Sequence, residues 1–509
     1  MPPRETAADP HLSALLVDPG PVPAVTQALG ARGDGHGDVV VAVGHATADT
    51  EVSLAARLEA FGLEGAELVA THEPGSAPGV LTSVPLPPGR FVARRLAVLG
   101  FGNAGPDALR AAGAALGRAT RGQAHVVADL TGAADDEALA AFVEGFMLGG
   151  WASPRWTAAG PVAGAEVPTQ LRVITDRDPQ VATAARVRAL ATVRARILGA
   201  TPSNIKSPAW FAAQARTLAR RHGLDVTLRG ERQLRAEGFG GLLAVGGGSA
   251  TPPTLVTVSW TPPAAGPRTR HVVLVGKGIT FDTGGLDVKP AEGMLPMKTD
   301  MLGAGIVLAV MAACQDLGVG VRVTGLLPLA ENAVSGAAYR PGDVITQYGG
   351  STVEIGNTDA EGRIVLADAL AHADRDLDPD LIVDVATLTG AARLALARVM
   401  APVFGSDQGL VADLVAAGDV TGEPLWPMPM PETYRPGLRS EVADLRQVVP
   451  GGAGSIMAAM FLAHFAGERA WAHLDIAGTG RSEVDSGLVG KGPTAFGTRL
   501  LLRWLQTLA

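Results

Sequence analysis

Short apolar runs alternate with stretches of helical spacing along the chain. In the first third this pattern predicts a small α/β domain, residues 1–176. Its strands are predicted at 13–17, 39–43, 96–99 and 125–130, and its helices at 106–120 and 135–148. A stretch rich in Gly, Ala and Pro at 157–168 interrupts the pattern. Apolar positions at helical spacing then continue to Gly199, so we expect a connecting helix over 177–200.

Strand and helix alternate more regularly in the larger C-terminal domain, 177–509. Strands are predicted at 271–275, 321–327, 352–355, 381–385 and 472–476, and helices at 303–317, 362–376, 390–399, 454–466 and 495–505. This alternation predicts an α/β fold whose mixed, mostly parallel sheet is flanked by helices. Ligands of such sheets bind beyond the C-terminal ends of the strands.

The bulk composition narrows the choice of partners and compartment. The chain has 509 residues, 47% of them apolar, and a net charge of -8, which argues against nucleic acid or an anionic membrane as the main partner. Its one cysteine, Cys314, lies in an apolar helical run and is interpreted as a small buried hydrophobe, and no disulfide can form within the chain. We expect no signal peptide and no membrane span, hence a cytoplasmic protein.

Charged residues gather in two Gly-rich segments, 275–300 and 356–363, although only 18% of the chain is charged. The segments contain Lys277, Asp282, Lys289, Asp300, Asp359, Glu361 and Arg363. Carboxylates gathered in this way repel one another unless cations lie among them, and hard divalent ions prefer oxygen ligands. The pattern therefore indicates a two-metal hydrolase.

Each residue also has a simpler interpretation. In an extended segment Asp359 and Glu361 would point to one side and reach the same metal cluster. Glu361 alone could be a solvated carboxylate at a helix start, and Asp300 an ordinary helix N-cap. Lys277 is either a counter-charge or, as a neutral amine, a metal ligand. Because neither segment contains His or Cys, we expect manganese, magnesium or zinc.

These motifs carry a family resemblance. Residues 357–363 read NTDAEGR, a motif of the leucine aminopeptidase family, the cytosolic dinuclear-metal aminopeptidases. Upstream of it, Lys277, Asp282, Lys289 and Asp300 stand at a spacing that resembles the family's other signature. The resemblance covers the C-terminal two-thirds of the chain. It includes TPSN at 201–204, AENAVSG at 330–336, YRPGD at 339–343, DVATLTGA at 384–391 and WAHLDIAGT at 471–479.

The resemblance implies a catalytic C-terminal domain that releases Leu-like N-terminal residues from peptides through a water activated by two metals. It implies that Lys277, Asp282, Asp300 and Glu361 hold one ion and that Asp282, Asp359 and Glu361 hold the other. Lys289 and Arg363 match catalytic positions, with a bicarbonate ion at Arg363 as proton shuttle. Met297, Thr387, Leu388 and Gly390 match substrate-binding positions, and the family forms homohexamers.

Rival interpretations remain open at this point. GFGNAG at 100–105 fits a dinucleotide-binding fingerprint but also a tight strand-to-helix turn, and the Gly-rich 244–253 segment lacks the rest of a phosphate-binding motif. A two-metal phosphoesterase would usually recruit His. A DNA-binding role would require a basic tract that the chain lacks.

Overall fold

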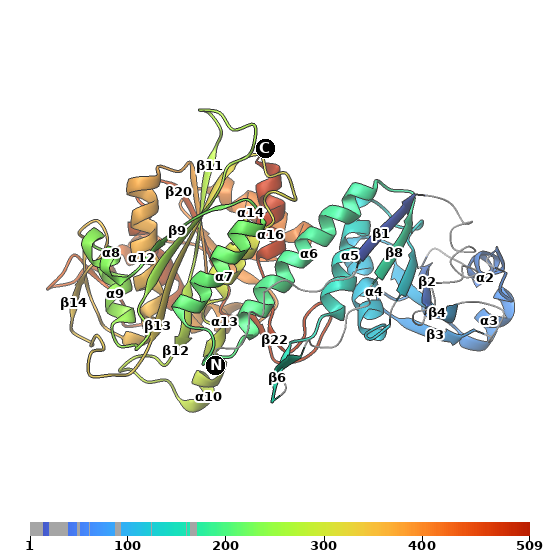
Figure 1. Cartoon of the computed structure of the whole chain (residues 1–509), viewed down its shortest axis with the longest axis horizontal. Helices are drawn as coiled ribbons and strands as arrows, with labels where there is room; N and C mark the ends of the chain where they lie inside the picture. Colours follow the sequence, from blue (N-terminus) through green and yellow to red (C-terminus); the bar gives the residue numbers. More distant parts are fainter. Residues whose placement is uncertain are drawn as a thin grey trace. The chain divides into compact units, whose positions relative to one another are not determined.

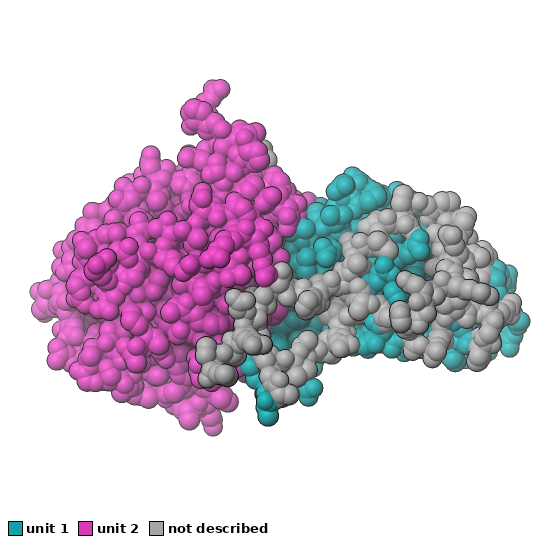
Figure 2. Space-filling view, viewed as in Figure 1, with its two compact units in different colours: residues 1–193, 483–491 teal, residues 194–482, 492–509 magenta. Residues whose placement is uncertain are grey.

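The computed structural model describes residues 14–19, 39–47, 51–60, 62–86, 93–123, 125–158, 160–162 and 170–508. The chain forms two compact units (Figure 2). Unit 1 comprises residues 1–193 and 483–491, and unit 2 comprises 194–482 and 492–509. The division falls inside a helix, whereas the sequence predicted a domain boundary at 176/177. The limits 1–176 and 177–509 therefore stay a prediction.

Unit 1 contains a six-stranded sheet in the order β1-β8-β5-β2-β4-β3. The strands are β1 (Ala14–Pro19), β2 (Val39–Ala46), β3 (Leu81–Pro85), β4 (Ala93–Gly102), β5 (His125–Asp129) and β8 (Gln170–Thr175). All neighbours are parallel except β3 and β4. The other elements are α2 (Glu51–Ala60), α3 (Gly65–His72), α4 (Pro106–Ala119), α5 (Asp136–Gly150), the pair β6 (Arg155–Thr157) and β7 (Gly160–Val162), and most of α6 (Pro179–Ala200). The predicted 157–168 loop lies partly outside the described residues.

Glycines let α4 and α5 approach closely. A Cβ at Gly113 would lie 2.2 Å from the Phe142 carbonyl oxygen, and one at Gly117 would lie 2.1 Å from the Phe146 carbonyl oxygen. Both distances are far below van der Waals contact, so the two helices can touch backbone to backbone only because these positions lack side chains.

Unit 2 is built on a nine-stranded mixed sheet, in the order β18-β17-β20-β16-β11-β13-β10-β9 with β12 paired to β13. The strands are β9 (Asp225–Arg229), β10 (Thr254–Trp260), β11 (His271–Gly276), β12 (Gly278–Asp282), β13 (Arg322–Asn332), β16 (Leu381–Ala386), β17 (Ala401–Gly405), β18 (Leu425–Pro427) and β20 (Ala470–Asp475). The central strands β13, β11, β16 and β20 are parallel, which confirms the predicted α/β class.

Helices cover both faces of this sheet. One face carries α9 (Gly240–Gly246), α12 (Glu361–His372) and α15 (Gly454–Phe465), and the other carries α7 (Pro208–Arg221), α11 (Leu302–Met311), α14 (Gln408–Thr421) and α16 (Thr498–Thr507). In Figure 1, α12 lies to one side of the strands and α14 and α16 to the other. All residues of β11 are buried, as expected for a parallel strand covered on both faces.

Helix α11 shows why an apolar run need not indicate a membrane. The segment 291–311 is long and apolar enough to cross a bilayer, but 72% of its most apolar window is buried. Every residue of α11 is buried, and the helix packs on β11, β13 and β16. Cys314 follows this helix and is buried, as predicted.

Several sequence predictions need correction, among them the helix predicted over 390–399, which ends at Leu396. The strand predicted at 352–355 exists as β15 (Thr352–Glu354), but it belongs to a separate sheet with β14 (Val344–Thr346) and β19 (Leu445–Arg446). The helix predicted to reach residue 317 ends at Met311. The helix predicted over 362–376 ends at His372, and a π-helical turn, Ala373–Leu377, follows. The outer strands β9, β10, β17 and β18 were not predicted.

Replacing Gly117 with Ala should lower the free energy of unfolding of unit 1 by about 1–3 kcal/mol, because the new Cβ forces α4 away from α5. Gly132→Ala is the control: a Cβ there meets nothing within 4 Å. The free energy of unfolding of each variant is measured by urea denaturation, with the hydrogen exchange of α4 and α5 amides as the probe of unit 1. Equal stability of the two variants would contradict the close-packing account.

Candidate metal centre

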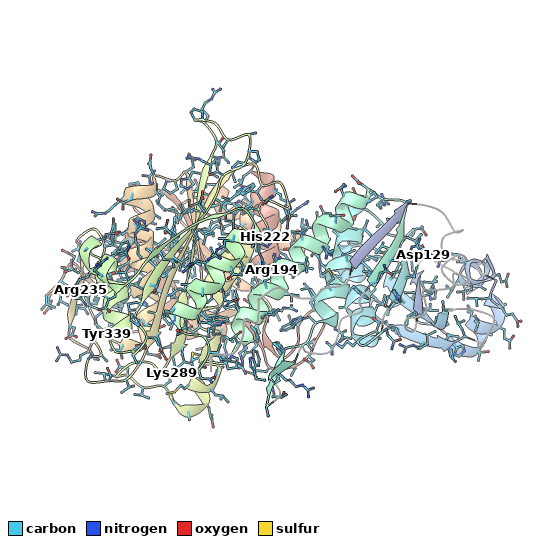
Figure 3. The ribbon with its side chains drawn as sticks, viewed as in Figure 1. Asp129, Arg194, His222, Arg235, Lys289 and Tyr339 are labelled. Carbon is cyan, nitrogen blue, oxygen red and sulfur yellow. The ribbon has the colours of Figure 1, made fainter. Side chains whose placement is uncertain are left out.

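Asp282 and Lys289 are brought together by a glycine turn. Asp282 ends β12 and is 2% exposed. Gly284 and Gly285 follow with φ of +89° and +65°, a conformation that residues with a Cβ rarely adopt. The chain turns back, and Lys289 Nζ lies 2.8 Å from Asp282 Oδ2. Figure 3 labels Lys289 in unit 2.

Lys277 lies directly after β11, at the centre of the acidic group. Its Nζ is 2.8 Å from Asp300 Oδ2 and 2.8 Å from Glu361 Oε1, and it donates a hydrogen bond to the Thr387 carbonyl oxygen at 2.9 Å. A Cβ at Gly362 would lie 2.7 Å from this Nζ, so a side chain there would displace the end of the lysine from its present position. The Lys277 side chain is 4% exposed, and its charge is therefore balanced by protein groups.

The NTDAEGR segment is not extended, and that prediction was wrong. Thr358–Ala360 form a 3-10 turn, and Glu361 begins α12. The Asn357 side chain accepts a hydrogen bond from the Asp359 N–H at 2.7 Å, which favours a turn over a strand. The turn still directs both acidic side chains to one place: single oxygens of Asp282, Asp359 and Glu361 all lie within 4.8 Å of one another. Lys289 Nζ also pairs with Asp359.

Burial and like charges shape the protonation of the acids. Burial, followed by the charge of Asp282, raises the pKa of Glu361 to about 8. Burial also raises the pKa of Asp300 to about 6, although Lys277 opposes the shift. Burial acts to lower the pKa of Lys277, but Asp300 and Glu361 outweigh it and hold that pKa above its usual range. The group as a whole favours bound positive charge.

The donor set fits divalent cations. It consists of carboxylates and amines without thiol or imidazole, the chemistry that suits manganese, magnesium or zinc in an oxygen-rich site. Glu361 Oε2 is buried and accepts no hydrogen bond. A buried carboxylate oxygen without a partner is costly, and a cation would satisfy it.

Arg363 lies two residues into α12, with its side chain buried. Its Nη1 donates to the Gln447 carbonyl oxygen at 2.8 Å, while its Nε is buried without a hydrogen-bond partner. Burial lowers the pKa of Arg363 to about 10. At neutral pH it remains a planar cation with an unused donor, the property of an anion-binding residue.

The predicted substrate-binding strip lies beside Lys277 and Asp300. Thr387 donates through Oγ1 to Asp300 Oδ1 at 2.7 Å. The Leu388 N–H donates to Asp475 Oδ1 at 3.1 Å, and Gly390 begins α13 (Gly390–Leu396). Met297 is half-buried in the 3-10 helix Leu295–Thr299, directly before Asp300.

Several supporting residues escaped the sequence analysis. Asn332 Nδ2 donates to Asp282 Oδ1 at 2.8 Å and to the Thr358 carbonyl oxygen at 3.0 Å. Tyr339, labelled in Figure 3, donates to the same carbonyl at 2.8 Å. Asp475 accepts from the Leu388 and Thr389 N–H groups. Asn332, Tyr339 and Asp475 each fall inside a motif that carried the family resemblance, which was the available signal.

The two phosphate-binding alternatives lose their basis. In the GFGNAG segment a Cβ at Gly100 would lie 1.9 Å from the Ala77 carbonyl oxygen, so this glycine serves packing within unit 1. In the other segment the hydroxyls of Ser249 and Thr251 both donate to Glu331 Oε2, at 2.6 and 2.8 Å. Both hydroxyls are therefore already bound to a carboxylate, whose negative charge would repel a phosphate.

The histidines have structural partners. His473 Nδ1 lies 2.6 Å from Asp384 Oδ1, and His372 Nδ1 lies 3.0 Å from Asp376 Oδ2. His464 Nε2 lies 3.4 Å from Ser351 Oγ. Among the residues that the structure describes, the candidate metal group contains aspartate and glutamate and no histidine.

Comparison with known proteins agrees with this geometry. Residues 193–502 match the catalytic domain of the cytosol aminopeptidase family. A probable cytosol aminopeptidase of Leifsonia xyli is 41% identical over 93% of this chain and 94% of its own length. A probable cytosol aminopeptidase of Streptomyces coelicolor is 40% identical over 88% of this chain and 89% of its own length. The solved structure of the bottromycin maturation enzyme BotP in complex with Mn superposes with a TM-score of 0.80, at 36% identity over 92% of this chain and 99% of that one.

The family match covers more than half of the chain, and the relatives match it almost from end to end. Together with the acidic centre of unit 2, this shows that the chain belongs to the cytosol aminopeptidase family and is a metal-dependent aminopeptidase.

Proposed function

We propose that the chain removes Leu-like N-terminal residues from peptides with two divalent cations held by the acidic centre. Lys277, Asp282, Asp300 and Glu361 hold one cation, and Asp282, Asp359 and Glu361 hold the other. The observation that carries the proposal is the convergence of Asp282, Asp359 and Glu361 oxygens within 4.8 Å, next to an unpartnered oxygen of Glu361. Asp282 and Glu361 are shared by both sets.

When bound, the cations would supply a water of lowered pKa and polarise the scissile carbonyl. We assign the two lysines different roles because their side chains differ in exposure to solvent. The Lys277 side chain is 4% exposed and enclosed by the acids. It would join the ligand set as a neutral amine, because a bound cation would replace its ammonium proton. The Lys289 side chain is 16% exposed, so its ammonium can reach a substrate and donate to the oxyanion that forms at the attacked carbonyl.

Arg363 is assigned to a proton-shuttling anion. Its buried Nε lacks a partner, and its guanidinium suits a small planar anion such as bicarbonate. All four acids of the centre are assigned to the cations, so none of them is left over as a separate general base. An anion held at Arg363 would take the proton from the attacking water and return it to the leaving amine.

The strip of Thr387, Leu388 and Gly390 is assigned to the peptide backbone, and Met297 to the pocket for the first side chain. The strip lies next to Lys277 through the Thr387 carbonyl, so a peptide along it would present its first carbonyl to the metal centre. A half-buried methionine favours apolar first residues.

Manganese is the favoured ion, since the BotP relative is described in complex with Mn, with zinc or magnesium as alternatives. A homohexamer and a cytoplasmic location complete the proposal and rest on the family alone.

Asp359→Ala and Lys289→Ala should separate metal binding from catalysis. The first removes a ligand, so bound metal should fall from about two ions to about one, with loss of nearly all turnover. The second should keep both ions and lower kcat roughly 10²–10³-fold, the usual effect of removing an oxyanion donor. Metal analysis and leucine anilide hydrolysis measure both.

Asp413→Ala, an exposed position on α14, is the control and should match the native enzyme. Full activity of both site variants would refute the assignment.

Substrate class can be tested with the metal removed and returned. The chelated enzyme should release no amino acid from a leucine anilide, and added Mn²⁺ should restore the reaction. An N-acetylated leucine anilide should stay intact because the free amine is lost. A phosphate ester offered to the Mn²⁺-loaded enzyme should also remain intact. Hydrolysis of the ester at a rate similar to the anilide would favour a phosphoesterase.

Bicarbonate dependence tests the role of Arg363. In carbonate-free buffer the native enzyme should slow by roughly tenfold or more, since general acid–base catalysis contributes 10²–10⁴-fold. Arg363→Ala should be equally slow with and without bicarbonate, because the anion has lost its cation. A variant that still responds to bicarbonate would place the anion elsewhere.

A further inference from the structure

Gln447 lies beside the segment that carries two of the acids. It follows β19, which runs parallel to β15, and its N–H donates to the Glu354 carbonyl oxygen at 2.9 Å. The chain after β15 continues into the NTDAEGR segment. Gln447 and the NTDAEGR segment therefore leave the small sheet at the same end, because β15 and β19 are parallel. Gln447 is 0% exposed.

The side chain of Gln447 bonds both ends of that segment. Its Oε1 accepts from the N–H groups of Gly356 at 3.1 Å and Asn357 at 3.0 Å. Its Nε2 donates to the Ala360 carbonyl oxygen at 3.0 Å. The partners settle the orientation of the amide, because two donors face the oxygen and an acceptor faces the nitrogen. Asp359 lies between these anchor points and Glu361 directly after them.

The backbone of Gln447 reaches a further functional group. Its carbonyl oxygen accepts the hydrogen bond from Arg363 Nη1 at 2.8 Å. One residue thus fixes the turn that carries Asp359, the start of the helix that carries Glu361, and the guanidinium of Arg363.

We infer that Gln447 is a positioning residue of the metal centre, a role that rests on the proposed function above. Its amide is suited to this place because two N–H groups and one carbonyl must be satisfied by a single buried side chain. A glutamate could accept the first two bonds but could not donate to Ala360. A leucine could make none of the three. The leucine change would free both ends of the turn, and the glutamate change would free only the Ala360 end; either would spread the acids from their common point.

The alternative is that Gln447 merely satisfies buried backbone groups. Gln347 offers a matched comparison, because it is also a buried glutamine of unit 2, 1% exposed. With its amide oriented to suit its neighbours, it donates to Asp368 and to the Ile364 carbonyl oxygen, both on α12 after Arg363, and to none of the four acids of the metal centre. A general loss of buried hydrogen bonds should affect both positions alike.

The test compares Gln447→Leu with Gln347→Leu in the full chain. Mn²⁺ affinity of each metal-free protein is measured by competition with a chromophoric chelator. Loss of a residue that orients metal ligands weakens binding roughly 10–100-fold, and we expect that loss for Gln447→Leu. Gln347→Leu should bind Mn²⁺ within about threefold of the native affinity, because neither Asp368 nor Ile364 is a proposed metal ligand. This should hold even if its melting temperature falls as much as that of Gln447→Leu.

Hydrogen exchange of the metal-free proteins gives a second readout. In Gln447→Leu the Gly356 and Asn357 amides should exchange at least about tenfold faster than in the native protein. In Gln347→Leu their exchange rates should match those of the native protein. Gln447→Glu, which keeps both acceptor bonds, should keep this protection and still bind Mn²⁺ more weakly than the native protein. If the leucine variant does not fold, the glutamate variant decides by its Mn²⁺ affinity.

Native Mn²⁺ affinity in the Gln447 variants, or an equal loss in both leucine variants, would overturn the positioning role. Failure of the native protein to bind Mn²⁺ or to cleave a leucine anilide would instead overturn the proposed function.

Discussion

The structure depends on the gathering of four carboxylates in one place, three of them buried. Asp282, Asp300 and Glu361 are buried, and Asp359, whose side chain is 32% exposed, lies close to them. Two like charges about 4 Å apart repel by roughly 4 kcal/mol at an effective dielectric of 20, so the group is stable only with cations among its members. Lys277 and Lys289 supply half of the charge required. Burial and the charge of Asp282 raise the pKa of Glu361, so a proton or another cation is favoured at this carboxylate.

The fold meets this constraint by joining separate segments through polar contacts. The ends of β11 and β12 supply Lys277 and Asp282, and the first turn of α12 supplies Glu361, where the helix dipole favours an anion. Buried side chains then hold the connecting backbone. Asn332 links the Asp282 turn to the Thr358 turn, Asp475 holds the 387–389 strip, and Gln447 closes the 356–360 turn.

The residue types of the site could be predicted from the sequence, but the local backbone structure that brings them together could not. Lys277, Asp282, Asp359 and Glu361 could be grouped because charged residues are scarce and these lie near glycines or strand ends. The 3-10 turn at Thr358–Ala360 was missed because the sequence alone allows either an extended segment or a turn capped by the Asn357 side chain. The turn is held by hydrogen bonds with Gln447, which is distant in sequence. Gln447 was missed because its partners are backbone groups up to 91 residues away, which leave no pattern in the sequence. The parallel strands were found from their apolar runs, whereas the placement of β15 in a separate sheet depends on pairing with β19.

Anomalous X-ray diffraction from crystals loaded with Mn²⁺ tests the central claim most directly. The account predicts two manganese peaks in each protein chain, both coordinated by Asp282 and Glu361, one also by Asp300 and Lys277 and the other also by Asp359. A fully loaded crystal with a single peak, or with peaks away from these carboxylates, would contradict it.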